Sequence, residues 1–454
     1  MAFSATSLAA GAGLPLHGDR PMVIINNLRS VSALLLGIAL MMVGSGALST
    51  LLGLRMAVSG APSWQVGMVM TMYFAGIVIG ATYAQKLIAA VGHIRAFAAF
   101  GSLVSAAALA HALHYDPWYW AGLRMLFGFC AVGMFMCSES WLAERSDNTT
   151  RGQIFALYQV AIYLSQGAGQ FLINIPDSSG FLILAITSVL MSLAIVPVAV
   201  TRVQAPPLPK PVRFRFVKLW ETSPTGMTTA FASGLMLGAI YGLGPLFAQR
   251  VGLETSQVAN FMGAVIIGGL VLQWPIGRIS DSIDRRTVML GVALATAFTC
   301  LALLGKGVQH GNGLLALAAL FGGLSFTLYP LAVAYTNDYL EADDLVPASG
   351  GLIMAYGLGA AVGPAAASWA MDGLGPDGLF QFCGAVAGLT AAFIALRMSQ
   401  RDAPAMADQG DFTAMPRTTQ VIYEIDPRCE DEPEDAGAAE PAADGAGDGN
   451  RTHV

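Results

Sequence analysis

The stretch RVQAPPLPKPVRFRFVK, residues 202–218, divides this chain of 454 residues into two parts of the same design. Six apolar segments precede it and six follow it. A helix needs about 20 residues to cross a hydrocarbon core of about 30 Å, and each segment is close to that length. We expect membrane spans near 30–53, 65–90, 95–114, 118–143, 152–174, 181–201, 226–248, 257–279, 287–305, 313–337, 346–370 and 378–398. The sequence therefore predicts an all-α integral membrane protein with twelve transmembrane helices in two pseudo-symmetric six-helix halves.

The composition agrees with a helical bundle in a bilayer. Hydrophobic residues make up 55% of the chain, charged residues only 11%, and there are 52 glycines. Small residues let membrane helices approach each other closely. We divide the chain into an N-terminal cytoplasmic arm (1–29), a first half (30–203), a basic cytoplasmic linker (204–225), a second half (226–399) and a cytoplasmic tail (400–454). The tail holds 13 Asp or Glu against four Arg, and its Ala, Gly and Pro content is typical of disorder.

The positions of the basic residues predict the orientation of the chain. If both termini lie in the cytoplasm, 19 of the 23 Lys and Arg are on the cytoplasmic side, and only Arg55, Arg250 and Lys306 lie outside. Loops rich in Lys and Arg stay in the cytoplasm, so we expect both termini there. Residues 1–27 lack the basic and apolar regions of a secretory signal, so we interpret the arm as a flexible cytoplasmic segment before the first span.

Residues 277–286, GRISDSIDRR, lie between the expected eighth and ninth spans. This string resembles the signature loop of the major facilitator superfamily (MFS), Gly-x-Leu-Ser/Ala-Asp-Arg/Lys-x-Gly-Arg-Arg. Four positions match: Gly277, Asp281, Arg285 and Arg286. Asp284 stands where glycine is usual, and the corresponding loop after the second span has Ala89 where the family has Asp. The resemblance implies a gating loop in which Asp281 faces the start of the fifth span, near residues 148–150; the alternative is an ordinary loop of cytoplasmic charges.

The fourth span carries a second resemblance. Arg124 is followed four residues later by Gly128, a pattern that MFS members often show there and that is associated with proton coupling in antiporters. Over about residues 30–400 the chain is similar to a branch of bacterial permeases of mostly unassigned substrate. The resemblance implies a secondary active transporter of the bacterial inner (plasma) membrane that moves a small molecule by alternating access and is coupled to protons. The Gly-Pro signature of drug antiporters is absent from the fifth span, and Gly363-Pro364 lies in the eleventh instead.

Two ionisable residues lie clearly inside a span, where each charge costs about 2.5–3.5 kcal/mol on insertion scales. They are Arg124 and Glu139, which are 15 residues, or roughly 22 Å, apart on one helix and therefore need other partners. Arg124 is either an anchor for hydrogen bonds between helices or part of the transport pathway. Glu139 is either a carboxylate that helps the helix leave the membrane or the group that carries the proton.

The fifth span contains polar residues at steps of four, three, four and four: Gln159, Tyr163, Gln166, Gln170 and Asn174. This spacing places them on one face of a helix. Lipid would leave their amides without partners, so the face either lines a water-filled cavity or joins another polar helix. Four residues of other spans are candidates to face them across the cavity, although core packing also explains each: Tyr241, Gln273, Trp274 and Tyr356.

Other classes of function lack their motifs in this sequence. There is no phosphate loop, no His-Glu-x-x-His string and no Cys-x-x-Cys pair, so we expect no enzyme activity, no metal and no cofactor. The expected partners are a small-molecule substrate, protons and the lipid bilayer, with no nucleic acid. A membrane sensor or scaffold derived from a transporter, and an uncoupled facilitator, are the alternatives. Residues 419–425 of the tail are either a docking strand for a cytoplasmic partner or solvated chain with chance apolar residues.

Overall fold

The computed structural model describes residues 20–146, 151–177, 181–200, 216–305, 311–340, 342–400, 409–410, 412–419 and 421. Its helices in the first half are α1 (Arg20–Val58), α2 (Ser63–Val91), α3 (His93–Ala110), α4 (Pro117–Glu144), α5 (Arg151–Gln170), the short 3₁₀ helix η1 (Phe171–Asn174) and α6 (Phe181–Val200). The linker holds α7 (Phe216–Thr222). The second half consists of α8 (Pro224–Arg250), α9 (Thr255–Ser280), α10 (Arg285–Leu303), α11 (Asn312–Asn337), α12 (Ala342–Leu374) and α13 (Gly378–Met398).

The prediction of a twelve-helix membrane protein is confirmed. Within the described ranges, eleven helices are long and apolar enough to cross a membrane. The remaining long helix, α5, has 20 residues and carries the predicted polar stripe, which lowers its hydropathy. It packs beside α1 and α9 in the bundle and is therefore the twelfth span.

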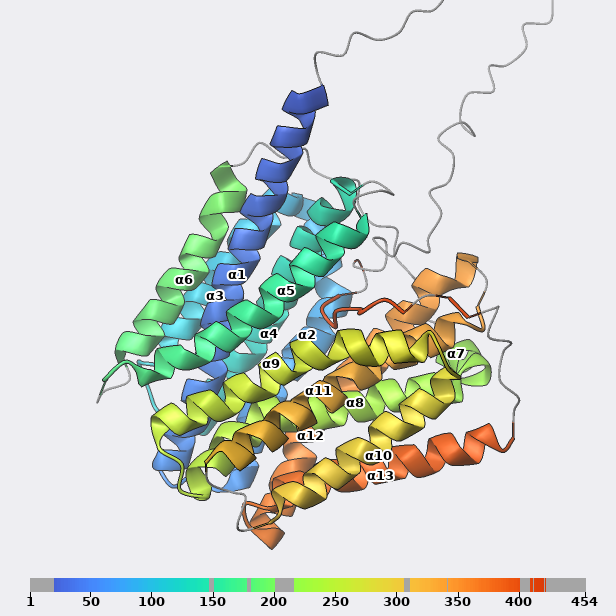
Figure 1. Cartoon of the computed structure of the whole chain (residues 1–454). Coiled ribbons are helices and arrows are strands. Elements are labelled where there is room, and N and C mark those ends of the chain that lie inside the picture. Colours follow the sequence, from blue (N-terminus) through green and yellow to red (C-terminus); the bar gives the residue numbers. More distant parts are fainter. Residues whose placement is uncertain are drawn as a thin grey trace, which may run out of the picture.

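The two halves repeat the same packing. In the first half α1 packs against α5, α2 against α4, and α3 against α6. In the second half the corresponding pairs are α8 with α12, α9 with α11, and α10 with α13. The halves meet where α2 packs on α12, α1 on α8 and α5 on α9 (Figure 1).

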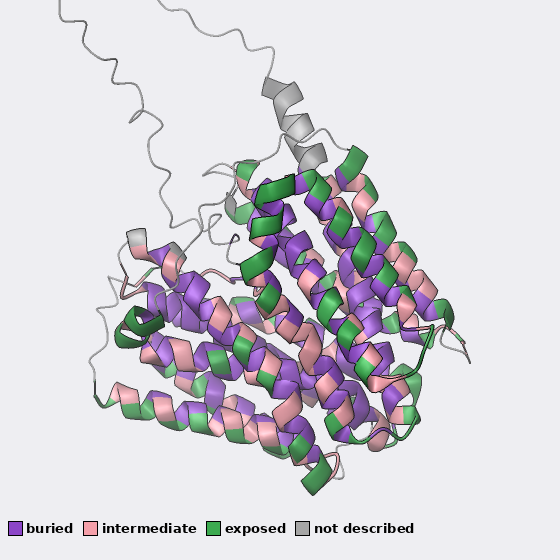
Figure 2. Cartoon of the chain, turned by 180° about the vertical axis from the view of Figure 1, so that it is seen from behind, coloured by how far each residue is buried: buried purple, intermediate pink, exposed green. Residues whose placement is uncertain are grey.

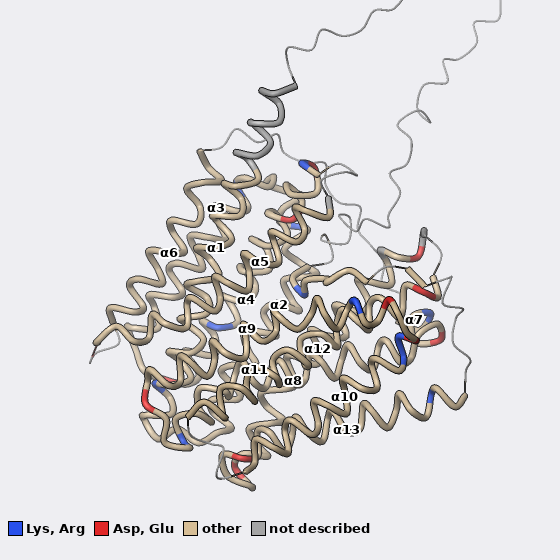
Figure 3. The backbone as a smooth tube through the Cα atoms, viewed as in Figure 1, with Lys and Arg blue, Asp and Glu red and all other residues tan. Residues whose placement is uncertain are grey.

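The surface of the bundle suits a bilayer. Large apolar side chains are exposed around its outside, for example Phe298, Trp369 and Leu389. Figure 2 shows the exposed and partly exposed residues on the outward faces of the helices and the buried ones between them. Figure 3 shows the charged residues gathered near the ends of the helices, with the middle of the bundle almost free of them. Apolar atoms on the outside and few charges at mid-depth are what a hydrocarbon solvent requires.

Glycines set the spacing of the tightest helix pairs. A Cβ on Gly128 of α4 would lie 2.0 Å from the carbonyl oxygen of Tyr73 in α2. At the corresponding pair in the second half, a Cβ on Gly268 of α9 would lie 1.9 Å from the carbonyl oxygen of Ala319 in α11. Both separations are too short for any side chain, so these helices are in contact backbone to backbone.

Gly128→Leu is therefore expected to destabilise the bundle by about 1–3 kcal/mol, the usual cost of overpacking. The thermal midpoint of the purified protein in detergent should fall. Gly122→Leu is the matched control, because a Cβ at Gly122 of the same helix meets nothing within 4 Å. Equal midpoints for the two variants would contradict the close contact of α2 and α4.

The halves are fastened together at one end of the bundle. We call the end at which α1 begins and α13 ends the terminal face, and the other end the opposite face. At the opposite face, the carboxylate of Asp372 in α12 accepts hydrogen bonds from the backbone N–H of Ser63 (3.0 Å) and Trp64 (3.2 Å), the first residues of α2. Arg250 of α8 donates to Ser63 Oγ over 2.6 Å. An anionic group at a helix N-terminus and this second bond hold the halves closed there.

Candidate substrate cavity

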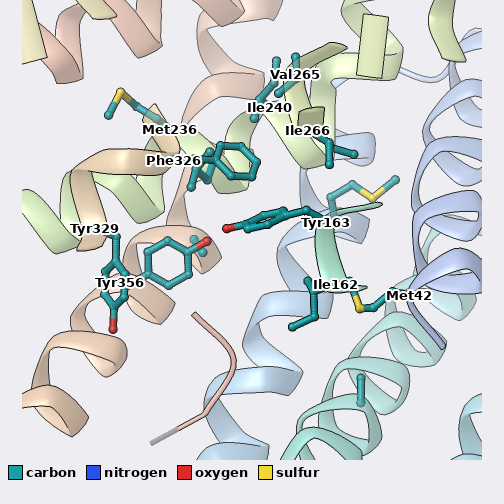
Figure 4. Packing of buried hydrophobic residues seen from close by; sticks show 14 of the residues in the cluster. Met42, Ile162, Tyr163, Met236, Ile240, Val265, Ile266, Phe326, Tyr329 and Tyr356 are labelled. Atoms are coloured by element: carbon teal, nitrogen blue, oxygen red, sulfur yellow. The ribbon is translucent and has the colours of Figure 1, made fainter. Parts of the chain in front are cut away.

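A cavity lies between the halves at mid-depth. Helices α1, α2, α4 and α5 line it on one side, α8 and α12 line it on the other, and tail residues 416–419 close it toward the terminal face. Of the predicted pathway residues, six line it: Arg124, Gln159, Tyr163, Gln166, Tyr241 and Tyr356. Figure 4 shows Tyr163 of α5 reaching toward Phe326 of α11 and Tyr356 of α12.

Arg124 is a buried cation in the cavity wall, with 2% of its surface exposed. Its Nη2 donates to Ser49 Oγ of α1 over 3.2 Å, and its guanidinium carbon lies 4.4 Å from the ring centre of Tyr73. Nε and Nη1 meet no hydrogen-bond acceptor within the described ranges. Leaving buried donors of a charged group unused is costly, and these two N–H groups are available to an acceptor inside the cavity.

The polar stripe of α5 joins the two halves. Gln159 Nε2 donates to Gln273 Oε1 of α9 over 3.2 Å, and Gln273 Nε2 donates to Tyr163 Oη over 3.2 Å. One turn deeper, Tyr241 Oη of α8 donates to Gln166 Oε1 over 3.2 Å. The stripe therefore both lines the cavity and connects helices, so the two sequence interpretations combine in one face.

Three residues proposed from the sequence lie elsewhere. Gln170 faces α1, where its Oε1 accepts from Thr50, and Asn174 lies in η1 near the opposite face, because α5 ends at Gln170. The indole of Trp274 is 67% exposed and packs under the guanidinium of Arg278. Gln273 bonds to the α5 stripe but does not itself line the cavity. Neighbouring residues on a helix point about 100° apart, so Trp274 does not share the direction of Gln273.

Glu139 is fully buried near the C-terminal end of α4, which lies at the terminal face. One carboxylate oxygen accepts hydrogen bonds from Tyr158 of α5 and from Thr418, and the other accepts from Thr419. Along the described chain, only hydroxyl groups bond to this carboxylate, and no Lys or Arg forms an ion pair with it. A carboxyl group surrounded by hydroxyls can exchange a proton without breaking a salt bridge.

The sequence matches one family of known proteins along most of its length. The match is to the family described as "Major Facilitator Superfamily", over residues 34–283 and again over residues 227–423. The chain belongs to the Major Facilitator Superfamily. The described part contains no group of three or more His, Cys, Asp or Glu side chains that could hold a metal.

Relatives of this MFS chain are found in bacteria. An uncharacterized MFS-type transporter of Yersinia pestis (strain Pestoides F) is 29% identical over 387 residues, covering 82% of this chain and 96% of the relative. The uncharacterized MFS-type transporter YcaD of Escherichia fergusonii is 29% identical over 377 residues, covering 83% and 96%.

Solved structures share the fold. The crystal structure of the nucleoside transporter NupG has a TM-score of 0.65 at 14% identity, covering 83% of this chain and all of that one (100%). A bacterial homolog of the human lysosomal transporter Spinster, in an inward-facing and unoccupied conformation, has a TM-score of 0.65 at 13% identity, covering 85% and 98%.

The MFS signature loop connects α9 to α10, and its charged side chains pair with other residues of the second half. Arg285 Nη1 contacts both carboxylate oxygens of Asp338, at the end of α11, over 2.6 Å. Its Nη2 lies 3.4 Å from Asp281 Oδ1, and Arg286 pairs with Asp284 over 3.0 Å. The predicted neighbours of Asp281, residues 148–150, lie outside the described residues.

Sequence reasoning missed the tail. The sequence predicts a disordered tail, whereas Gly410, Phe412 and residues 417–419 form hydrogen bonds with both halves. Met415 and Val421 are buried, and Arg417 donates to Tyr163 Oη. The disordered composition belongs to the whole tail, and it conceals a short stretch in which the side chains of Arg417, Thr418 and Thr419 donate hydrogen bonds to the MFS core. The only signal was the apolar island at 419–425.

Proposed function

We propose that this MFS protein is a secondary active transporter that moves a small anionic molecule across the bacterial inner membrane by alternating access, coupled to protons. Arg124 carries the proposal. It supplies a buried positive charge with two unused N–H donors in the wall of a cavity that both halves form. A planar guanidinium matches a carboxylate or phosphate with two parallel hydrogen bonds.

The closed face and the orientation of the chain together support an inward-facing state. By the positive-inside rule the terminal face is cytoplasmic. The bonds of Asp372 and Arg250 close the opposite face, and the cavity reaches the tail at the terminal face. Alternating access would break the contacts at one face while the helix ends at the other approach each other.

Glu139 supports proton coupling. A group that carries protons has to alternate between a hydrated, ionised state and a desolvated, protonated state. Glu139 is buried in α4, the helix that also holds Arg124, and it lies toward the cytoplasmic side of the cavity. Its hydroxyl partners can donate to the ionised carboxylate and accept from the protonated carboxyl group.

Two measurements test the function. An untargeted comparison of metabolites retained or lost by cells that overexpress the protein should single out carboxylates or phosphates. Proteoliposomes loaded with the compounds found should then accumulate them only when a proton gradient is imposed. Enrichment of amines or neutral compounds would reject the anionic substrate. Binding without movement would favour a sensor or scaffold, and flux that ignores the gradient would favour an uncoupled facilitator.

Gln166→Leu is expected to lower flux per molecule while leaving expression near that of the wild type. The variant removes the acceptor of the partly buried Tyr241 hydroxyl; loss of a partner costs up to about 1–3 kcal/mol for a fully buried group. Flux in proteoliposomes, normalised to the amount of protein, is the measurement. Gln153→Leu on the exposed face of the same helix is the matched control. Wild-type flux in Gln166→Leu would show that α5 does not line the pathway.

A further inference from the structure

The tail segment, which we define as residues 409–410, 412–419 and 421, is held at the terminal face by the signature loop and by Asp338 at the end of α11. Gly410 N–H donates to Asp338 Oδ1 over 3.3 Å, and its carbonyl oxygen accepts from Arg285 Nη2 over 2.7 Å. Phe412 N–H donates to Asp281 Oδ1 over 2.8 Å, and its ring packs on Gly277. The charged side chains of the loop thus hold the backbone of the segment where the cavity opens.

Deeper in the cavity, Arg417 of the tail segment bridges the two halves. One nitrogen donates to Tyr163 Oη in the first half, and the other donates to the carbonyl oxygen of Phe326 in the second half over 3.1 Å. The guanidinium carbon lies 4.5 Å from the ring centre of Phe326, 5.6 Å from Tyr356 and 5.9 Å from Tyr163. Three aromatic faces and two acceptors form a site for this cation. Phe326 is eleven residues, or roughly 16 Å, from the end of α11, so the segment penetrates deeply.

The end of the tail segment covers the proposed proton carrier. Thr418 and Thr419 donate to the two carboxylate oxygens of Glu139. Val421 is buried beside Ile88 of α2 and Met136 of α4, so the segment finishes against the first half. It therefore crosses from the second half to the first inside the pathway.

We propose that the tail segment is an inhibitor built into the chain: it binds the cytoplasmic mouth of the cavity, locks the inward-facing state and has to leave before transport proceeds. The halves cannot close at the cytoplasmic face while a peptide bridges them there. With the segment in place, the remaining cavity holds about 150 Å³, which is below the about 300–1,000 Å³ of typical small-molecule sites. The segment also occupies the hydrogen-bonding positions of Glu139.

The connection to the membrane domain makes such binding effective. Eight residues separate Gln400, after α13, from Gln409. Short tethers hold a segment at an effective concentration of about millimolar. Weak individual contacts are then sufficient to keep the mouth occupied.

Labelling of a cysteine in the cavity tests this without any transport, so its outcome is independent of the proposed function. In the full chain without native cysteines, Ser45→Cys places one thiol in the cavity wall. Inverted membrane vesicles expose the terminal face to an impermeant maleimide. Deleting residues 401–454, or Arg417→Ala, should speed labelling about tenfold. A segment that is bound about nine-tenths of the time leaves the thiol accessible for only about one-tenth of it.

Two controls separate displacement of the segment from general damage. Thr413→Val changes a tail threonine outside the contacts with Glu139 and should label slowly, whereas Thr418→Val with Thr419→Val should label fast. Ser399→Cys, exposed at the end of α13, should label equally with and without the tail. A synthetic peptide of residues 409–425 at about 1 mM should restore protection to the deleted form. Equal labelling of Ser45→Cys in the full and the deleted chain overturns the proposal, as does a peptide that gives no protection.

Discussion

Glu139→Gln is expected to abolish accumulation of substrate driven by a proton gradient and to spare downhill exchange. Glutamine has nearly the same shape: its oxygen can accept from Tyr158 and Thr418, and its amide N–H can donate to the hydroxyl of Thr419, so the fold and the tail contacts should persist. It cannot take up or release a proton. The bound substrate can still cross with the rocking halves, but no proton gradient can drive it uphill.

The measurement compares two assays on the same proteoliposomes. Uptake against a substrate gradient with an imposed pH difference should disappear in Glu139→Gln, and exchange of labelled for unlabelled substrate without a pH difference should stay near the wild-type rate. Glu144→Gln, exposed near the end of the same helix, is the control and should retain both activities. Uphill accumulation by Glu139→Gln with its pH dependence intact would assign the proton to another group, and Glu139 would then be a structural carboxyl.

Hydropathy was sufficient to predict the fold because a bilayer leaves few alternatives. Each span has to satisfy its own backbone hydrogen bonds and therefore becomes a helix of about 20 residues. Even α5, which carries the polar stripe of Gln159, Tyr163 and Gln166, is predicted from the sequence as an apolar segment at 152–174. The pairing of helices across the halves follows from the family fold and not from any local pattern.

The candidate site was predictable only where helix geometry constrains it. The spacing in α5 predicts one polar face, and the structure places Gln159, Tyr163 and Gln166 on the cavity. Gln170 faces α1 instead, and Asn174 lies beyond the end of the α-helix. Trp274 shows the other limit: it follows the buried Gln273 in the chain, but its position around α9 places it on the exposed face.

Apart from the apolar island at 419–425, the sequence carries no local signal for the tail contacts. Arg417 meets Tyr163 across 254 residues of chain, and Thr418 meets Glu139 across 279. Neither pair follows a helical period, and an acidic, Ala- and Gly-rich context suggests disorder for every residue in it. Such contacts depend on the shape and charge of an assembled cavity, which exists only after the two halves have packed.

Arg124→Lys is expected to weaken both accumulation and exchange by roughly 10- to 100-fold, since hydrogen bonds to charged groups contribute about 1.5–3 kcal/mol. Lysine keeps the positive charge, but it replaces a planar fork with a single ammonium group. The donors that face the cavity would be lost together with the stacking on Tyr73. Because the substrate contact is used in every crossing, the defect should appear in both assays, unlike that of Glu139→Gln.

Arg278→Lys is the matched control for this result. Its guanidinium also lies over an aromatic ring, that of Trp274, but on the exposed side of α9 away from the cavity. It should leave flux unchanged. The full proposal further requires that the affinity for the anionic substrate, measured as the concentration that half-saturates exchange, worsens in Arg124→Lys more than the maximal rate does. If Arg124→Lys transports normally, a charge alone is sufficient. If even Arg124→Gln does so, then Arg124 only anchors α4 to Ser49 and Tyr73, and the substrate anion has to bind elsewhere in the cavity.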